Sequence, residues 1–136
     1  MVAPARGLKI RDLVKRPPIT IPQNASLLEA ADVMAKNNIG ALLVTDSTGS
    51  PVAVLSERDI VKAISMRIPL STPVEAFMST TMITVNADDS VEKAAELMWI
   101  NNIRHLVVVE GGRAIGIISI RDLINPRVLR HLREHG

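Results

Sequence analysis

The sequence predicts an α/β (α+β) fold made of two copies of one β-α-β-β-α unit. A shift of 64 residues aligns the chain with itself, so that Asn37-Asn38-Ile39 meets Asn101-Asn102-Ile103. Near the end of each copy the shift becomes 63, and Ser56, Arg58 and Asp59 meet Ser119, Arg121 and Asp122. A unit this small does not bury enough apolar surface alone, so we expect the two copies to share a core.

Each copy begins with a short β-branched strand, which is followed by a helix. The apolar residues of the helix have the i, i+3, i+4, i+7 spacing of one helical face. They are Leu27, Ala30, Ala31 and Met34 in the first copy and Val91, Ala94, Ala95 and Met98 in the second. Ser26 and Ser90 are predicted N-caps, and Glu29 completes a capping box in the first copy. An Asn pair suits the end of each helix, because Asn tolerates the left-handed conformation.

Two apolar runs follow each helix and are separated by turn residues. They span 41–44 and 52–55 in the first copy and 106–109 and 114–118 in the second. Apolar residues do not alternate with polar ones, so we expect strands that are covered on both faces. The predicted boundaries are 10–64 for the first repeat, 65–73 for a linker, 74–125 for the second repeat and 126–136 for a C-terminal basic helix or tail.

The composition limits the available chemistry. The chain has 136 residues and no cysteine, which excludes disulfides, thiolate metal ligands and cysteine nucleophiles. It contains no Walker loop, nucleophile elbow or zinc-protease helix, so we expect no enzymatic activity, no required cofactor and no metal site. We find no secretory signal and no apolar run long enough to cross a bilayer. We therefore expect a cytoplasmic protein that does not bind membranes.

The most distinctive motif lies where the last strand of each repeat ends. It is Gly116-Ile117-Ile118-Ser119-Ile120-Arg121-Asp122 in the second copy, and Ala53-Val54-Leu55-Ser56-Glu57-Arg58-Asp59 in the first. Ser119 opens a helix, whose free N–H groups favour a phosphate. Arg121 adds a cation, and the two oxygens of Asp122 can accept hydrogen bonds from the cis hydroxyls of a ribose. A plain N-cap explains the same Ser-x-x-Asp spacing and stays open as the alternative.

The element order and this motif resemble the CBS domain, named after cystathionine β-synthase, over nearly the whole chain. The resemblance implies two repeats that pack with pseudo-twofold symmetry and hold an adenine nucleotide in the cleft between them. The chain is similar to small prokaryotic proteins that consist of one stand-alone tandem CBS pair, or Bateman module. The implied function is that of a regulatory, ligand-sensing module for AMP or a related ligand, namely ADP, ATP or S-adenosylmethionine. We expect the regulated protein to be a separate partner.

The resemblance assigns residues of both repeats to each of two clefts. The preferred cleft combines Thr20, Ile21, Ile39, Gly40 and Ala41 around the base with Arg104, His105, Ser119, Arg121 and Asp122 around the ribose phosphate. The second, weaker cleft combines Thr84, Val85, Ile103 and Arg104 with Gly40, Ser56, Arg58 and Asp59. The first is preferred because small Gly40 and Ala41 leave room for a flat ring and Arg104 supplies a cation.

The resemblance also implies a homodimer of CBS pairs. Apolar residues of the second helices are candidates for its interface: Ile60, Val61, Ile64, Leu123 and Ile124. Trp99 lies beside the apolar stripe of its helix, which suggests that it also belongs to a subunit interface.

An alternative function comes from the uneven charge. The overall charge of +2 combines +4 in residues 1–16 and +2 in residues 121–136 with −4 between them. Basic ends suit a protein-interaction adaptor or a nucleic-acid-binding protein that holds no nucleotide. Nucleic-acid binding is the less favoured reading, because no aromatic residue is interleaved there to stack on bases.

Overall fold

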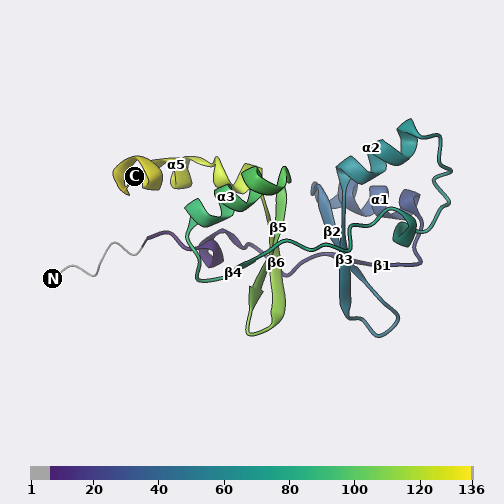
Figure 1. The fold of residues 1–136 in the computed structure, drawn as a ribbon, viewed down its shortest axis with the longest axis horizontal. Helices are drawn as coiled ribbons and strands as arrows, with labels where there is room; N and C mark the ends of the chain where they lie inside the picture. Colours follow the sequence, from purple (N-terminus) through teal and green to yellow (C-terminus); the bar gives the residue numbers. More distant parts are fainter. Residues whose placement is uncertain (1–6, 136) are drawn as a thin grey trace. The chain divides into compact units, whose positions relative to one another are not determined.

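The computed structural model describes residues 7–135, which form two compact units (Figure 1). The first-repeat unit comprises residues 18–82, and the second-repeat unit comprises the described residues up to 17 together with those from 83 onward. Arg6, at the basic N-terminus, and Gly136, at the end of the predicted C-terminal tail, lie outside the described residues.

The first-repeat unit is a three-stranded sheet with two helices on one face (Figure 1). Its elements are β1 (Thr20–Pro22), α1 (Leu27–Asn37), β2 (Ala41–Thr45), β3 (Pro51–Ser56), α2 (Glu57–Ser65) and the 3-10 turn η2 (Val74–Ala76). The strand order is β1-β2-β3, with β1 parallel and β3 antiparallel to the central β2. The predicted β-α-β-β-α order is confirmed.

The second-repeat unit repeats this topology with the strand order β4-β5-β6. Its elements are the 3-10 turn η1 (Ile10–Leu13), β4 (Thr84–Asn86), α3 (Val91–Asn101), β5 (His105–Glu110), β6 (Arg113–Ser119), α4 (Ile120–Leu123) and α5 (Pro126–His135). The helix after the last strand has only four residues here, against nine in the first repeat. It stops before Pro126, which opens α5, and Asn125 Oδ1 accepts a hydrogen bond from Val128 N at 3.0 Å.

The N-caps and C-caps read from the sequence are confirmed. The capping box is not, because the Glu29 carboxylate accepts from Ser26 Oγ at 3.4 Å, which is not the contact with Ser26 N that a capping box requires. Ser26 Oγ accepts a hydrogen bond from Glu29 N at 3.0 Å, and Ser90 Oγ accepts one from Lys93 N at 3.2 Å. The C-caps Asn38 and Asn102 are left-handed, with φ angles of 52° and 51°. Both copies therefore begin and end this helix with the same local chemistry.

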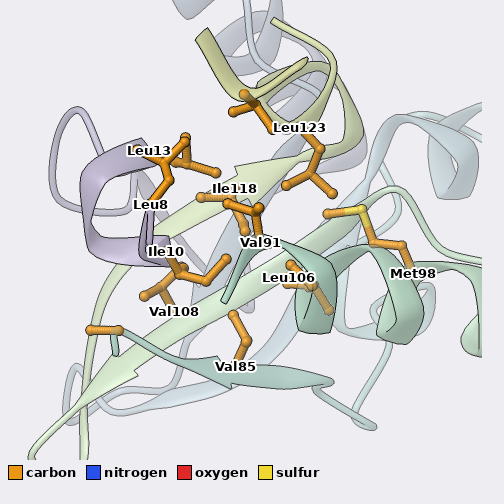
Figure 2. Packing of buried hydrophobic residues seen from close by; sticks show 13 residues of the cluster. Leu8, Ile10, Leu13, Val85, Val91, Met98, Leu106, Val108, Ile118 and Leu123 are labelled. Atoms are coloured by element: carbon orange, nitrogen blue, oxygen red, sulfur yellow. The ribbon is translucent and has the colours of Figure 1, made fainter. Parts of the chain in front are cut away.

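Each unit has its own apolar core on the helix-covered face of its sheet. The first contains Leu27, Ala30, Met34, Leu42, Val44, Ala53, Leu55, Ile60, Ala63 and Val74, together with Ile21 and Ala25. The second is drawn in Figure 2 and includes Met98, Leu106, Val108, Ile118 and Leu123. The predicted stripe of α3 is correct except at Ala95, which lies at its edge and is exposed, while Leu97 packs partly against the core.

The segment before β1 packs in the second-repeat unit, and the segment before β4 packs in the first-repeat unit. Each segment therefore joins the repeat that it does not directly precede. Ile10 and Leu13 are buried in the core of the second-repeat unit (Figure 2), and Val74 is buried in the core of the first. An antiparallel bridge joins Lys9 to Ser90, and the same bridge joins Pro73 to Ser26. These pairs correspond under the 64-residue shift, so the two repeats bind their segments in the same way.

Two of the five residues expected at a subunit interface are buried inside the units. Ile60 is 9% exposed and Leu123 is 7% exposed, because both face their own apolar cores. That part of the expectation is wrong. Val61, Ile64 and Ile124 are exposed, as is Trp99, with 87% of its surface accessible.

Within residues 7–135, none of the helices combines the length and apolar character that a membrane crossing requires. The cytoplasmic location stays a prediction.

Candidate functional site

The two faces of the first-repeat sheet carry different residues, because side chains alternate along a strand. Leu42 and Val44 of β2 belong to the core, so Ala41 and Leu43 point to the opposite face. Residues paired across strands share a face. Ala41 pairs with Ser56 and Leu43 pairs with Thr20. Three predicted site residues, Thr20, Ala41 and Ser56, therefore share the sheet face that the helices do not cover.

The second-repeat sheet has the same arrangement. Leu106 and Val108 of β5 belong to the core, so His105 and Val107 point to the other face. His105 pairs with Ser119 and Val107 pairs with Thr84. Thr84, His105 and Ser119 therefore share the face that corresponds to that of Thr20, Ala41 and Ser56.

Two predicted ligand residues point the other way. Ile21 is 3% exposed and Val85 is 2% exposed, and both side chains belong to the apolar cores. Any contribution of these two residues to a ligand site therefore comes from their backbone.

The Ser and Asp of the repeated motif form the same reciprocal cap in both repeats. Asp59 Oδ2 accepts hydrogen bonds from Ser56 N at 2.8 Å and from Ser56 Oγ at 3.2 Å. Asp122 Oδ2 accepts from Ser119 N and Ser119 Oγ at the same two distances. The prediction that Ser-x-x-Asp is a helix N-cap is therefore confirmed, and the cap uses Oδ2 of each aspartate. Oδ2 already accepts two hydrogen bonds, and Oδ1 of each carboxylate takes no part in the cap.

A backbone hydrogen bond holds the residues before the central strand next to the start of the following helix. Gly40 O accepts from Glu57 N at 2.9 Å, and Arg104 O accepts from Ile120 N at 2.8 Å. Within each repeat, residues 39–41 or 103–105 therefore lie beside the Ser-x-x-Asp motif. Arg104 is exposed, while Ile39, Gly40, Ile103 and His105 are half-buried. The assignment of Gly40 and Ala41 to the same ligand as Asp122 stays a prediction.

The helix starts differ in how well they suit an anion. The dipole of a helix is the sum of its aligned peptide dipoles. With only four residues, α4 has a weaker positive end at Ser119 than α2 has at Ser56. The free N–H groups at the start of α4 therefore attract a phosphate less strongly than the sequence of the second repeat suggests.

One charged residue near the motif was not found from the sequence. Lys15 Nζ lies 3.9 Å from Asp122 Oδ1, the oxygen that the cap leaves unused. The signal is absent from the motif itself, because Lys15 lies before β1, far from the motif in the sequence. It follows only from the packing of residues 8–17 in the second-repeat unit.

A second charged group fixes the same N-terminal segment. The Arg11 guanidinium donates hydrogen bonds to Asp88 Oδ1 and to Glu110, while Lys9 Nζ lies 3.8 Å from Asp88 Oδ1. The hydrogen bond from Arg11 and its positive charge hold the pKa of the Asp88 carboxyl below its usual range.

Comparison with known proteins places this geometry in a family. The model of the CBS domain matches residues 10–66 and 74–127. A curated relative, an uncharacterized 17.7 kDa protein of Acidianus ambivalens, is 35% identical over 129 residues, which span 94% of this chain and 78% of that protein. Two other curated relatives are much longer, and the chain spans only 32% and 22% of their lengths.

Two solved structures share both fold and sequence with the chain. A CBS domain protein of Pyrobaculum aerophilum complexed with AMP has a TM-score of 0.85 and 40% identity, covering 93% of this chain and 99% of that one. The CBS domain pair of protein MJ0100, in complex with 5′-methylthioadenosine and S-adenosyl-L-methionine, has a TM-score of 0.77 and 32% identity, covering 85% of this chain and 92% of that one. The chain therefore belongs to the CBS domain family, and it contains two CBS domains in tandem.

Proposed function

We propose that the chain is a regulatory, ligand-sensing module that binds an adenine nucleotide of the AMP type and has no catalytic activity of its own. The observation that carries the proposal is the fixed carboxylate at the end of each last strand. The cap holds Asp59 and Asp122 through Oδ2, so each Oδ1 has a set position and can accept hydrogen bonds from ribose hydroxyls. A preorganised acceptor of this kind binds without first losing side-chain freedom.

The similar structures support an adenosine ligand. One holds AMP, and another holds 5′-methylthioadenosine and S-adenosylmethionine. These three molecules share adenine and a ribose with both cis hydroxyls, and they differ at the 5′ position. A carboxylate that binds the shared ribose therefore suits all of them, and the residues near the 5′ group decide among them.

We assign the preferred site to Asp122 rather than Asp59. In the second repeat, Arg104 and His105 lie next to the motif, whereas the first repeat has the uncharged Gly40 and Ala41 at these positions. The Arg104 guanidinium and the His105 ring beside Ser119, Arg121 and Asp122 suit a phosphate, and the smaller residues suit the base. The assignment of both groups to one ligand, with Thr20, Ile21 and Ile39 near the base, rests on the family resemblance. Thr84, Val85, Ile103, Ser56, Arg58 and Asp59 belong to the weaker site.

Calorimetry with AMP and 2′-deoxy-AMP tests the ribose contact. The wild-type chain is expected to bind AMP and to bind the deoxy ligand about tenfold more weakly, since a hydrogen bond to a charged group is lost. Asp122→Asn, which keeps an oxygen for the cap, is expected to weaken AMP binding more than Asp59→Asn does. The melting temperature of each variant without ligand controls for the cap.

Two results would contradict these assignments in different ways. Loss of AMP binding in Asp59→Asn with normal binding in Asp122→Asn would reverse the choice of site. A chain whose melting temperature and calorimetric signal respond to none of AMP, ADP, ATP or S-adenosylmethionine would refute the proposed function, because a ligand of the native state raises its stability.

Nucleotide binding is proposed to shift a conformational or assembly equilibrium that a separate, unidentified protein reads. We also propose that the module is a homodimer. The exposed apolar side chains of Val61, Ile64, Trp99 and Ile124 support this, since their exposure ranges from 51% to 87%. Light scattering at micromolar concentration is expected to give twice the chain mass, and Val61→Glu combined with Ile124→Glu is expected to give a monomer. A monomeric wild-type chain would exclude this assembly.

A further inference from the structure

Lys15 lies at the one carboxylate oxygen that the proposed site has available. Its Nζ is 3.9 Å from Asp122 Oδ1, while Asp122 Oδ2 accepts the hydrogen bonds of Ser119. The Asp122 side chain is 23% exposed and the Lys15 side chain is 82% exposed. An ammonium group on a long, solvated side chain therefore lies where a ribose is proposed to bind.

The backbone of Lys15 is held in place by its neighbours, although its side chain is exposed. Leu13 is buried in the core of the second-repeat unit, and Val14 packs against the same core. The chain then passes close over β6 at Gly116. A Cβ atom there would lie 2.6 Å from Val14 Cγ1 and 3.4 Å from Arg16 O. Gly116 is therefore the residue that lets the segment approach β6 and bring Lys15 to Asp122.

The first repeat has no equivalent cation. The 64-residue shift places Ser79 at the position of Lys15, and the motif has Ala53 at the position of Gly116. Asp59 has the same cap as Asp122. The two carboxylates thus have the same local geometry, but the segment packed on the second-repeat unit carries Lys15 where the corresponding segment of the first-repeat unit carries the uncharged Ser79.

The Lys15–Asp122 ion pair contributes little to the stability of the fold. An exposed pair of this type contributes little to folding, so exchanging its partner costs little. When ribose hydroxyls donate to Asp122 Oδ1, the ammonium of Lys15 is displaced from that oxygen and stays beside the ligand. There it attracts a phosphate and offsets the repulsion between the phosphate and the Asp122 carboxylate.

We propose that Lys15 is a phosphate-binding residue of the Asp122 site and makes it selective for anionic adenine nucleotides over 5′-methylthioadenosine and the cationic sulfonium of S-adenosylmethionine. This inference rests on the proposed function and adds the 5′ group of the ligand to it. The positive end of α4 is weak, and Lys15 supplies the positive charge that a longer helix would otherwise provide.

Calorimetry with AMP and with 5′-methylthioadenosine tests the proposal. The parent protein carries Asp59→Asn, which weakens the other proposed site, so that the measured binding reports the Asp122 site. Lys15→Met is expected to weaken AMP binding about five- to tenfold, as for the loss of one charged contact, and to leave 5′-methylthioadenosine within about twofold. Lys9→Met is the matched control. It removes the same charge from the same segment, but its ammonium pairs with Asp88.

The outcomes separate the two proposals. If the wild-type chain binds no adenine nucleotide, the proposed function fails, and the role of Lys15 fails with it. If the wild type binds AMP but the Asp59→Asn parent binds neither ligand, the choice of the Asp122 site and the role of Lys15 fail, while the proposed function stands. If the parent binds both ligands and Lys15→Met changes neither affinity, or weakens both equally, Lys15 does not bind the phosphate. Tighter AMP binding by Lys15→Met would show that Lys15 only competes for Asp122 and would also overturn the proposal.

Discussion

Arg11 Nη2 donates a hydrogen bond to Asp88 Oδ1 at 2.8 Å, and Arg11 Nε donates to the same oxygen at 3.1 Å. The two residues lie 77 positions apart, before and after residues 18–82 of the first-repeat unit. Glu110 of β5 accepts a further hydrogen bond from the Arg11 guanidinium. This contact joins the segment before the first repeat to the turn before α3 and to β5 in the second-repeat unit.

The Arg11–Asp88 pair makes stability depend on pH in one direction. Because Arg11 lowers the pKa of Asp88, the pair stabilises the fold above the ordinary pKa of an aspartate, and this contribution is lost as the pH falls through the lowered value. Arg11→Met is therefore expected to lower the melting temperature at about pH 7 by more than it does at about pH 3.

Circular dichroism across this pH range measures the effect, with Arg130→Met as the control for the loss of one exposed arginine. Both arginine contacts are exposed to solvent, so added salt is expected to reduce the difference between wild type and Arg11→Met. A difference that grows toward acid pH would contradict the assignment.

Gly116→Ala tests the close approach of the N-terminal segment to β6. The added Cβ would lie 2.6 Å from Val14 Cγ1, so Val14 must move, at an expected cost of about 1–3 kcal/mol in the free energy of unfolding. Urea denaturation measures this cost. Val14→Ala in the same chain is expected to restore part of the lost stability, because it removes the contacting methyl groups.

Ala53 provides the internal comparison for Gly116, since the first repeat has a Cβ at the matching position. Ala53→Gly is therefore not expected to relieve any contact, and it should lower stability by removing a buried methyl group. If Gly116→Ala proves neutral, the segment from Val14 to Arg16 does not pack over β6 as described.

Much of each repeat could be predicted because its signals are local. Ser26 and Asn38 mark the ends of α1 by their own hydrogen bonds and backbone conformation. The apolar spacing places Met34 and Met98 in the cores. The Asn125-Pro126 dipeptide also carries a local signal for the early end of α4, since proline disfavours helical backbone at the preceding residue.

The remaining features depend on contacts that no local pattern encodes. Ile10 and Val74 each belong to the core of the repeat that they do not directly precede, and Lys15 reaches Asp122 by the same packing. The Ser-x-x-Asp motif poses a different difficulty, because a cap and a ribose site require the same residues. The structure shows the cap at Oδ2, and the ribose contact at Oδ1 stays a proposal.

Ile10→Ala tests how far the second-repeat core depends on the N-terminal segment. Ile10 is fully buried among Leu8, Leu13 and Val108, so its truncation is expected to cost about 2–5 kcal/mol in the free energy of unfolding. The expected signature is a lower urea midpoint with an unchanged slope. Ile120→Ala is the matched control, because Ile120 is 45% exposed and its truncation is expected to cost about 0.5 kcal/mol or less. Equal effects of the two substitutions would mean that the segment is not part of this core.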